Sequence, residues 1–263
     1  MKRDELLERY ANGERDFSYQ DLSKIYLSDR DLSGATFIGT NFSHAQLSGA
    51  NLSNANLSNA NLNKARLGAT NLQDANLSNA DLRNSDLSGD CHGHNINFSN
   101  ANFEKTDFDE GIIEKANFSG ANFRNTRFLQ YFITNCNFSN ADFSDSFLNE
   151  STLDNSNFYN ANFSRAYIEV TFNNASLIKS NLSNAILVLY KNIIEQKIDL
   201  NQTELKQTIY CNELNQFDLP TNIDSSQIIK VQDKKSIIKH INNNVELQKI
   251  KYTDYLLEYL NEL

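Results

Sequence analysis

Large apolar side chains recur at every fifth position along most of the chain, and this spacing is its strongest pattern. The series covers residues 17–87, 98–168 and 172–187. We call the large apolar residue of each repeat the centre. The two residues before a centre are usually Ala and then Asn or Asp, as residues 50–64 show. A repeat this regular has to be explained before any single helix or strand is assigned.

A period of five fits neither an α-helix, which repeats every 3.6 residues, nor a strand, which repeats every two. A chain that turns a corner after each repeat would bring every centre to the inside. Four such corners close a square coil of roughly twenty residues, and stacked coils pair like parallel strands at ~4.8 Å per coil. The small Ala two residues before each centre leaves room for the Leu or Phe, so the interior fills without voids.

Residues 15–189 resemble the pentapeptide-repeat family, whose motif is A(D/N)LXX. The resemblance implies an all-β solenoid, the right-handed quadrilateral β-helix of that family, in agreement with the packing argument. About nine coils at that spacing would form a rod roughly 40 Å long.

The two ends of the chain depart from the repeat. Residues 1–14 predict a short N-terminal helical cap, with an amphipathic helix over 4–12 that stops at Gly13. Residues 190–263 predict a mainly helical C-terminal cap or a small appended domain. Such caps cover the open ends of a solenoid.

Within the C-terminal segment, three apolar residues at spacing five predict a degenerate extra coil over residues 198–212. Helical segments are expected after it. One is predicted from a group of isoleucines, and another, over residues 247–263, from clear helical spacing. The isoleucines of the first segment are Ile228, Ile229, Ile237, Ile238 and Ile241.

Assigning the repeats in fours to the sides of the square shows which residues face solvent. The residue before each centre points outward, and on the first two sides these residues are plain polar columns. On the third and fourth sides, large apolar residues face outward in the C-terminal half, beside an acidic corner. The candidate interaction surface consists of Ile112, Phe132, Phe147, Tyr167, Ile186, Asp109, Glu110 and Glu150.

An exposed apolar patch of this kind usually marks an interaction site. Three explanations fit the pattern: the protein's own C-terminal segment folds back over the patch, a partner protein binds it, or a second copy of the chain does. A homodimer through the C-terminal helix is one form of the last alternative.

Charge and composition limit the classes of partner. The chain has 24 Lys and Arg against 33 Asp and Glu, a net charge of -9, which argues against binding of nucleic acid through a basic face. No apolar run is long enough to span a bilayer, so no membrane partner is expected. The N-terminal residues lack the apolar core of a secretion signal. With 3 widely separated cysteines, an odd number, these features predict a reducing cytoplasm.

One short segment resembles a metal site. Cys91, His92 and His94 lie between two glycines where the period of five slips by one residue. Zinc needs three or four ligands around one centre, and adjacent residues on a turn rarely converge in that way. A bulge loop is the simpler interpretation.

No residues indicate catalysis. The histidines do not pair with a nucleophile and an orienting acid, no phosphate-binding glycine loop is present, and a core filled by Leu, Phe and Ala leaves no substrate cavity. The chain is therefore expected to be no enzyme and to need no cofactor.

The sequence predicts a non-catalytic structural or protein-interaction module, a rigid β-helical rod that presents a binding surface to a partner still to be identified. An alternative comes from the resemblance, because some pentapeptide-repeat proteins mimic duplex DNA and bind the type II topoisomerase DNA gyrase, conferring quinolone resistance. Residues 15–189 hold 12 Lys and Arg against 18 Asp and Glu. Duplex DNA of the same length carries about twenty-four charges, so the match is poor.

Overall fold

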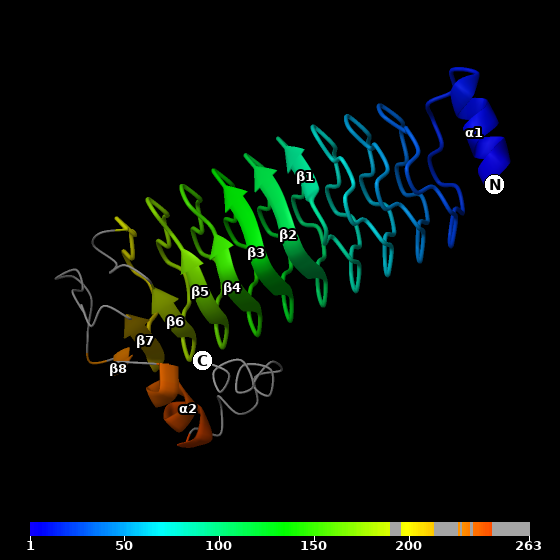
Figure 1. Ribbon diagram of the computed structural model, residues 1–263. Helices are drawn as coiled ribbons and strands as arrows, with labels where there is room; N and C mark the ends of the chain where they lie inside the picture. Colours follow the sequence, from blue (N-terminus) through cyan, green and yellow to red (C-terminus); the bar gives the residue numbers. More distant parts are fainter. Residues whose placement is uncertain (190–195, 213–225, 227, 232–233, 244–263) are drawn as a thin grey trace.

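The computed structural model describes residues 1–189, 196–212, 226, 228–231 and 234–243. These residues form an all-parallel β-solenoid in which each coil pairs with the coils before and after it (Figure 1). In the first coil, bridges start five residues apart, and each reaches a residue twenty positions further along. They join Asp16 to Thr36, Asp21 to Asn41, Tyr26 to Gln46 and Asp31 to Asn51. The coil thus has four sides, which we number from the Asp16 side.

The corners explain why the repeat uses Asn and Asp. Asn54, at one corner, has a φ of 58°, in the left-handed region that Asn tolerates better than most residues. The Ala55 N–H donates to the Leu52 carbonyl at 3.0 Å and closes the turn. The Asn51 Oδ1 atom, just before the centre, accepts from the Ser53 N–H at 3.1 Å. Where Asn or Asp precedes the centre, its side chain therefore holds the turn that follows.

The centres fill the interior of the solenoid. Leu62 and Phe123 are both fully buried, as the inward assignment predicts. From coil to coil the phenylalanine rings stack face to face: the centroids of Phe98 and Phe118 lie 4.9 Å apart, and those of Phe118 and Phe138 lie 4.7 Å apart. These separations match the spacing of stacked coils, so one ring per coil fills that part of the core.

Continuous strands form in the C-terminal half of the rod, where they make an eight-stranded parallel sheet in sequence order. The strands are β1 (Cys91–His94), β2 (Asp107–Glu114), β3 (Arg127–Thr134), β4 (Phe147–Thr152), β5 (Tyr167–Thr171), β6 (Ile186–Leu189), β7 (Thr208–Asn212) and β8 (Ile228–Val231). Strands β2 and β3 run from the third side across the corner to the fourth side, so residues of both sides belong to one strand.

A helix, α1 (Arg3–Ala11), lies at the N-terminal end of the rod, where the sequence predicts one (Figure 1). Its Leu6 side chain is completely buried in the same core cluster as the first centres. The Tyr10 hydroxyl donates to the Ser33 carbonyl at 2.9 Å, which ties the helix to the first coil. The apolar face of α1 thus shields the first centres from water.

Residues 198–212 continue the solenoid. Asp199 bridges to Ser176, Glu204 bridges to Asn181, and β7 pairs with β6. Beyond this coil the described residues include a second helix, α2 (Lys234–Asn243).

The helical prediction for Ile228 and Ile229 is wrong, because both lie in strand β8, which pairs in parallel with β7. Without β8 the outer edge of β7 would expose unpaired backbone groups, and a run of β-branched residues satisfies them as one more strand. The helix predicted over residues 247–263 lies outside the described residues, and so does a homodimer contact through it.

Candidate functional site

Three of the five apolar residues of the candidate interaction surface are covered by the chain itself. Phe147, Tyr167 and Ile186, on the third side, are 0%, 1% and 0% exposed. They pack in one cluster with Ile237 and Ile241 of α2. These three residues are therefore not part of an open surface, and they share their buried cluster with the apolar stripe of α2.

The other two apolar residues remain open to solvent. Ile112 and Phe132, on the fourth side, are 52% and 54% exposed. They lie directly opposite each other in the parallel pairing of β2 with β3, so their side chains are neighbours along the rod. Exposure of this extent costs the folded chain the hydrophobic free energy that burial would provide. This apolar pair is the feature of the fourth side that needs an explanation.

Acidic side chains border the apolar pair along the corner between the third and fourth sides. Asp90, Glu110 and Glu150 are all exposed there, and Asp109 beside them is partly buried on the third side. The Asp90 N–H donates to the Glu110 carbonyl at 2.8 Å, which places these two residues on adjacent coils. Gln130 lies between Glu110 and Glu150 and donates to the Glu150 carboxylate at 2.9 Å. The corner thus presents three carboxylates in one column.

A buried tyrosine supports the face from below. The Tyr131 side chain, fully buried, donates from its hydroxyl to the Cys91 carbonyl at 3.1 Å. Its ring lies under Gly111, where an added Cβ atom would come within 2.4 Å of the ring carbon Cζ. Gly111 therefore leaves the space that Tyr131 occupies, and the two hold the backbone beneath Ile112 in place.

Strand β1 forms the next coil of the same face. A one-residue insertion between Asp86 and His92 lengthens the step between bridged residues from twenty to twenty-one. Instead of the expected bulge loop, residues Cys91–His94 form a strand in continuous parallel register with β2. The insertion also places His92 in the same outward column as Ile112, to which His92 is paired.

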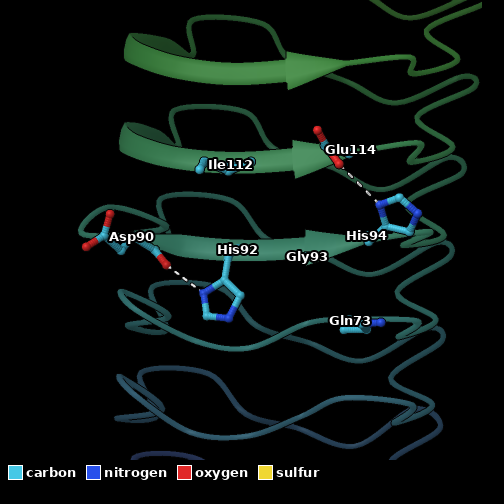
Figure 2. Close-up of a pocket in the computed structure, with 7 residues that line it drawn as sticks. All are labelled: Gln73, Asp90, His92, Gly93, His94, Ile112 and Glu114. Carbon is cyan, nitrogen blue, oxygen red and sulfur yellow. Dashed lines mark hydrogen bonds and ion pairs between the residues drawn. The ribbon is translucent and has the colours of Figure 1, made fainter.

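Two shallow depressions lie on either side of Ile112. The first has a volume of about 480 Å³ and is lined by Gln73, Asp90, His92, Gly93, His94, Ile112 and Glu114 (Figure 2). The second has a volume of about 490 Å³ and is lined by Asp90, Glu110, Gly111, Ile112, Gln130, Phe132 and Glu150. The Ile112 side chain thus forms a ridge between two hollows with acidic borders.

The residues that resemble a metal site do not converge. Cys91 is buried, and burial raises the pKa of its thiol to about 12, so it stays protonated near neutral pH. The His92 Nδ1 atom lies 2.9 Å from the Asp90 carbonyl, whereas the His94 Nδ1 atom lies 3.4 Å from the Glu114 carboxylate (Figure 2). Among the residues that the structure describes, no group of three or more His, Cys, Asp and Glu could hold a metal ion.

The face also contains Asp90, His94 and Glu114, which the sequence prediction does not include. The signal was available, because His92 falls in the outward column of Ile112 once the insertion is counted. The neighbouring coils then bring Asp90 and Glu114 to the two edges of this column.

Comparison with known proteins gives two kinds of match. The family model of pentapeptide repeats matches with 8 copies, over residues 21–59, 50–89, 94–128 and 136–169. No curated protein sequence matches the chain. No helix in the described part of the chain is both long and apolar enough to cross a membrane.

Several solved structures match the chain with low structural similarity. HetL, a pentapeptide repeat protein involved in heterocyst differentiation regulation from the cyanobacterium Nostoc sp. strain PCC 7120, is 27% identical over 80% of this chain and 97% of its own, with a TM-score of 0.44. A second pentapeptide repeat protein from Nostoc PCC 7120 is 32% identical over 41% of this chain and 86% of its own, with a TM-score of 0.34.

The plasmid-mediated fluoroquinolone resistance protein QnrB1 is 20% identical over 72% of this chain and 90% of its own, with a TM-score of 0.41. All these TM-scores lie below 0.5, so the names of these proteins carry no function over to this chain. The matches of the family model span just over half of the chain, with the period and four-sided coil described above. The chain belongs to the pentapeptide-repeat family.

Proposed function

We propose that this protein is a non-catalytic interaction module whose fourth side binds a partner protein. The observation that carries the proposal is the contrast between the two apolar columns. On the third side Phe147, Tyr167 and Ile186 are buried in a cluster that includes residues of α2, whereas on the fourth side Ile112 and Phe132 stay half exposed. A chain that covers one column but not the adjoining one keeps the second available for another molecule.

The rigidity of the face supports this function. Ile112 and Phe132 sit on strands bonded to the coil before and the coil after, and the Tyr131 ring fills the space beneath them. A partner would therefore meet a surface that is already in its binding conformation. Binding to a preorganised surface avoids the entropic cost of ordering it.

The interior of the rod supports a role without chemistry. The core is filled by stacked rings and aliphatic centres, and the two hollows beside Ile112 are open to solvent. Pentapeptide-repeat proteins are in general not catalysts. Binding uses the outer surface that this fold offers, whereas catalysis would need an enclosed site.

The cysteines support the proposal that the protein works in the cytoplasm. Among the described residues, Cys91 and Cys136 are buried and form no disulfide. Free thiols of this kind are typical of reducing compartments.

Mimicry of duplex DNA has less support, because cations are interleaved with the carboxylates of the rod. The Arg127 Nε atom lies 3.2 Å from the Asp107 carboxylate, and Arg124 reaches the Asp142 carboxylate at 3.9 Å. Such pairs break the continuous negative field that duplex DNA presents.

Affinity capture from cell extract tests the proposal. The bait proteins are the full chain, the Ile112→Asp/Phe132→Asp variant, and a Tyr19→Asp/Tyr26→Asp variant as the matched control. Tyr19 and Tyr26 are 78% and 58% exposed, so the control removes comparable exposed aromatic surface elsewhere on the rod. We expect a partner that the full chain and the control retain and that the first variant loses. Identical captures by all three would refute the proposal.

A further inference from the structure

We call Ile112, Phe132 and the residues that line the two hollows beside them the fourth-side face. We propose that this face recognises a basic protein segment, in which a large apolar residue is flanked on both sides by Arg or Lys. This inference rests on the interaction function proposed above and specifies the chemistry of the partner. It follows from what surrounds the apolar pair rather than from the pair alone.

The charged side chains that line the two hollows are predominantly acidic. Among the described residues that line the two hollows, four carry carboxylates and none is lysine or arginine. Asp90, Glu110 and Glu150 occupy the corner edge, and Glu114 lies toward the opposite edge beside His94. A partner that buried an apolar side chain against Ile112 would bring its flanking residues over these carboxylates. Charge complementarity therefore favours cations on both sides of that side chain.

The spacing of the face fits a short segment. Asp90 and Glu110 lie on adjacent coils, ~4.8 Å apart along the rod, and Glu150 lies two coils beyond Glu110. An extended segment places every second side chain on one face, ~6.6 Å apart. A pattern Arg-x-Leu-x-Arg thus sets the leucine against the apolar pair while the arginines reach toward the acidic border. An interface built on two half-exposed side chains is small, as in transient complexes.

Two other occupants of the face are disfavoured by the same charges. A second copy of the chain would present its own acidic border, and like charges across an interface repel. Residues 244–263 of this chain contain two lysines against four acidic residues, a net of -2. Both alternatives are acidic on balance, even though Lys249 and Lys251 flank Ile250 in residues 244–263.

A random-peptide display library, panned against the full chain, tests the inference. Recovered peptides are then measured as synthetic fluorescent probes against the full chain and its variants. We expect enrichment of Arg or Lys around a large apolar residue, and loss of binding on Ile112→Asp/Phe132→Asp. Raising the salt from roughly 0.05 to 0.5 M should weaken binding several-fold, because the contacts with the exposed border are screened.

Charge reversal isolates the role of the border. Glu110→Lys/Glu150→Lys should weaken the selected peptide about tenfold, since it replaces attraction by repulsion at two exposed positions. Both residues have positive φ, and lysine already adopts this conformation at Lys105 and Lys115, so the backbone accepts the change. Asp29→Lys is the matched control, because Asp29 has the same corner conformation four coils away.

The outcomes separate this inference from the proposed function. One contrary result is a set of selected peptides that depend on Ile112 and Phe132 and yet show no enrichment in Arg or Lys. Another is a set that binds the charge-reversed variant as well as the full chain. Either result would refute the preference for a basic partner, while the proposed interaction function would stand. Recovery of no peptide that depends on Ile112 and Phe132 would overturn this inference, and the capture experiment then decides the proposed function by itself.

Discussion

The pairing of Gly111 with Tyr131 yields a test of the structure beneath the binding face. In the described structure a Cβ atom added at Gly111 would lie 2.4 Å from Cζ, 2.5 Å from the hydroxyl and 2.6 Å from Cε2 of Tyr131. No real Cβ contact is this short, so Gly111→Ala forces the ring or the backbone to move.

The ring has little freedom to move. Tyr131 is fully buried, its ring packs edge-on against Phe108 at 5.3 Å, and its hydroxyl donates to the Cys91 carbonyl. Overpacking of a core costs about 1–3 kcal/mol. Loss of the buried hydroxyl's partner adds about 1–3 kcal/mol. Gly111→Ala should therefore lower the free energy of unfolding by roughly 2–6 kcal/mol.

A double-mutant cycle with Tyr131→Leu identifies the cause. Leucine lacks the ring atoms that the new methyl group meets, so in the Tyr131→Leu background the alanine has space. There Gly111→Ala should be neutral or should stabilise the chain by about 0.4–1 kcal/mol, through a smaller entropy of the unfolded state. The effect of one substitution thus changes sign with its neighbour.

Thermal and urea unfolding, followed by circular dichroism, measure all four proteins of the cycle. Hydrogen exchange at β2 and β3 shows whether a loss of stability is local, as the nearest-neighbour stability of solenoids predicts. An equal destabilisation by Gly111→Ala in both backgrounds would show that the close contact with Tyr131 is not its cause, and the reasoning would fail.

Four further predictions concern the core, the covered third side, the thiols and the alternative function. Leu62→Asp should abolish cooperative unfolding, because it places an unpaired charge in an apolar interior. The outward Asn61→Asp should change the melting temperature little, and equal effects of the two substitutions would show that Leu62 does not point inward. Ile237→Asp should release α2 from the third side and increase binding of an apolar dye and self-association, while Lys239→Asp, on the exposed face, should do neither. Because burial raises the pKa of Cys91 to about 12, a thiol reagent at neutral pH should modify it only after unfolding; rapid labelling of the native protein would contradict its burial. The protein at micromolar concentration should not inhibit gyrase supercoiling, for the charge reasons given above, and inhibition at that level would restore DNA mimicry as the leading function.

The repeat made most of the fold predictable from local sequence. The period fixes where the chain turns, and the polar residue before each centre forms its hydrogen bond within the same turn, as Asn51 does with Ser53. Burial of Leu62 and Phe123 follows from the same period, since each repeat is packed almost alike. The period also placed Ile112 and Phe132 on the outside.

The tail was less predictable, because its structure depends on pairing between distant residues. Ile228 and Ile229 belong to a group of isoleucines that predicts a helix, yet in the structure they form a strand that pairs with the edge of β7. The hydrophobic pattern around residue 228 does not show that the edge of β7 lies beside it.

The sequence by itself determined which side chains of the repeats face outward, because the period of five dictates inside and outside at every coil. Only the tertiary structure decided which of those side chains remain exposed. Phe147 and Phe132 are the same residue type in adjoining outward columns, but Phe147 is 0% exposed and Phe132 is 54% exposed. Phe147 belongs to a buried cluster that also contains Ile237 and Ile241 of α2, more than eighty residues further along the chain, whereas Phe132 lies outside that cluster. Local periodicity carries no information about where such a helix packs, since that depends on the shape and register of the assembled coils.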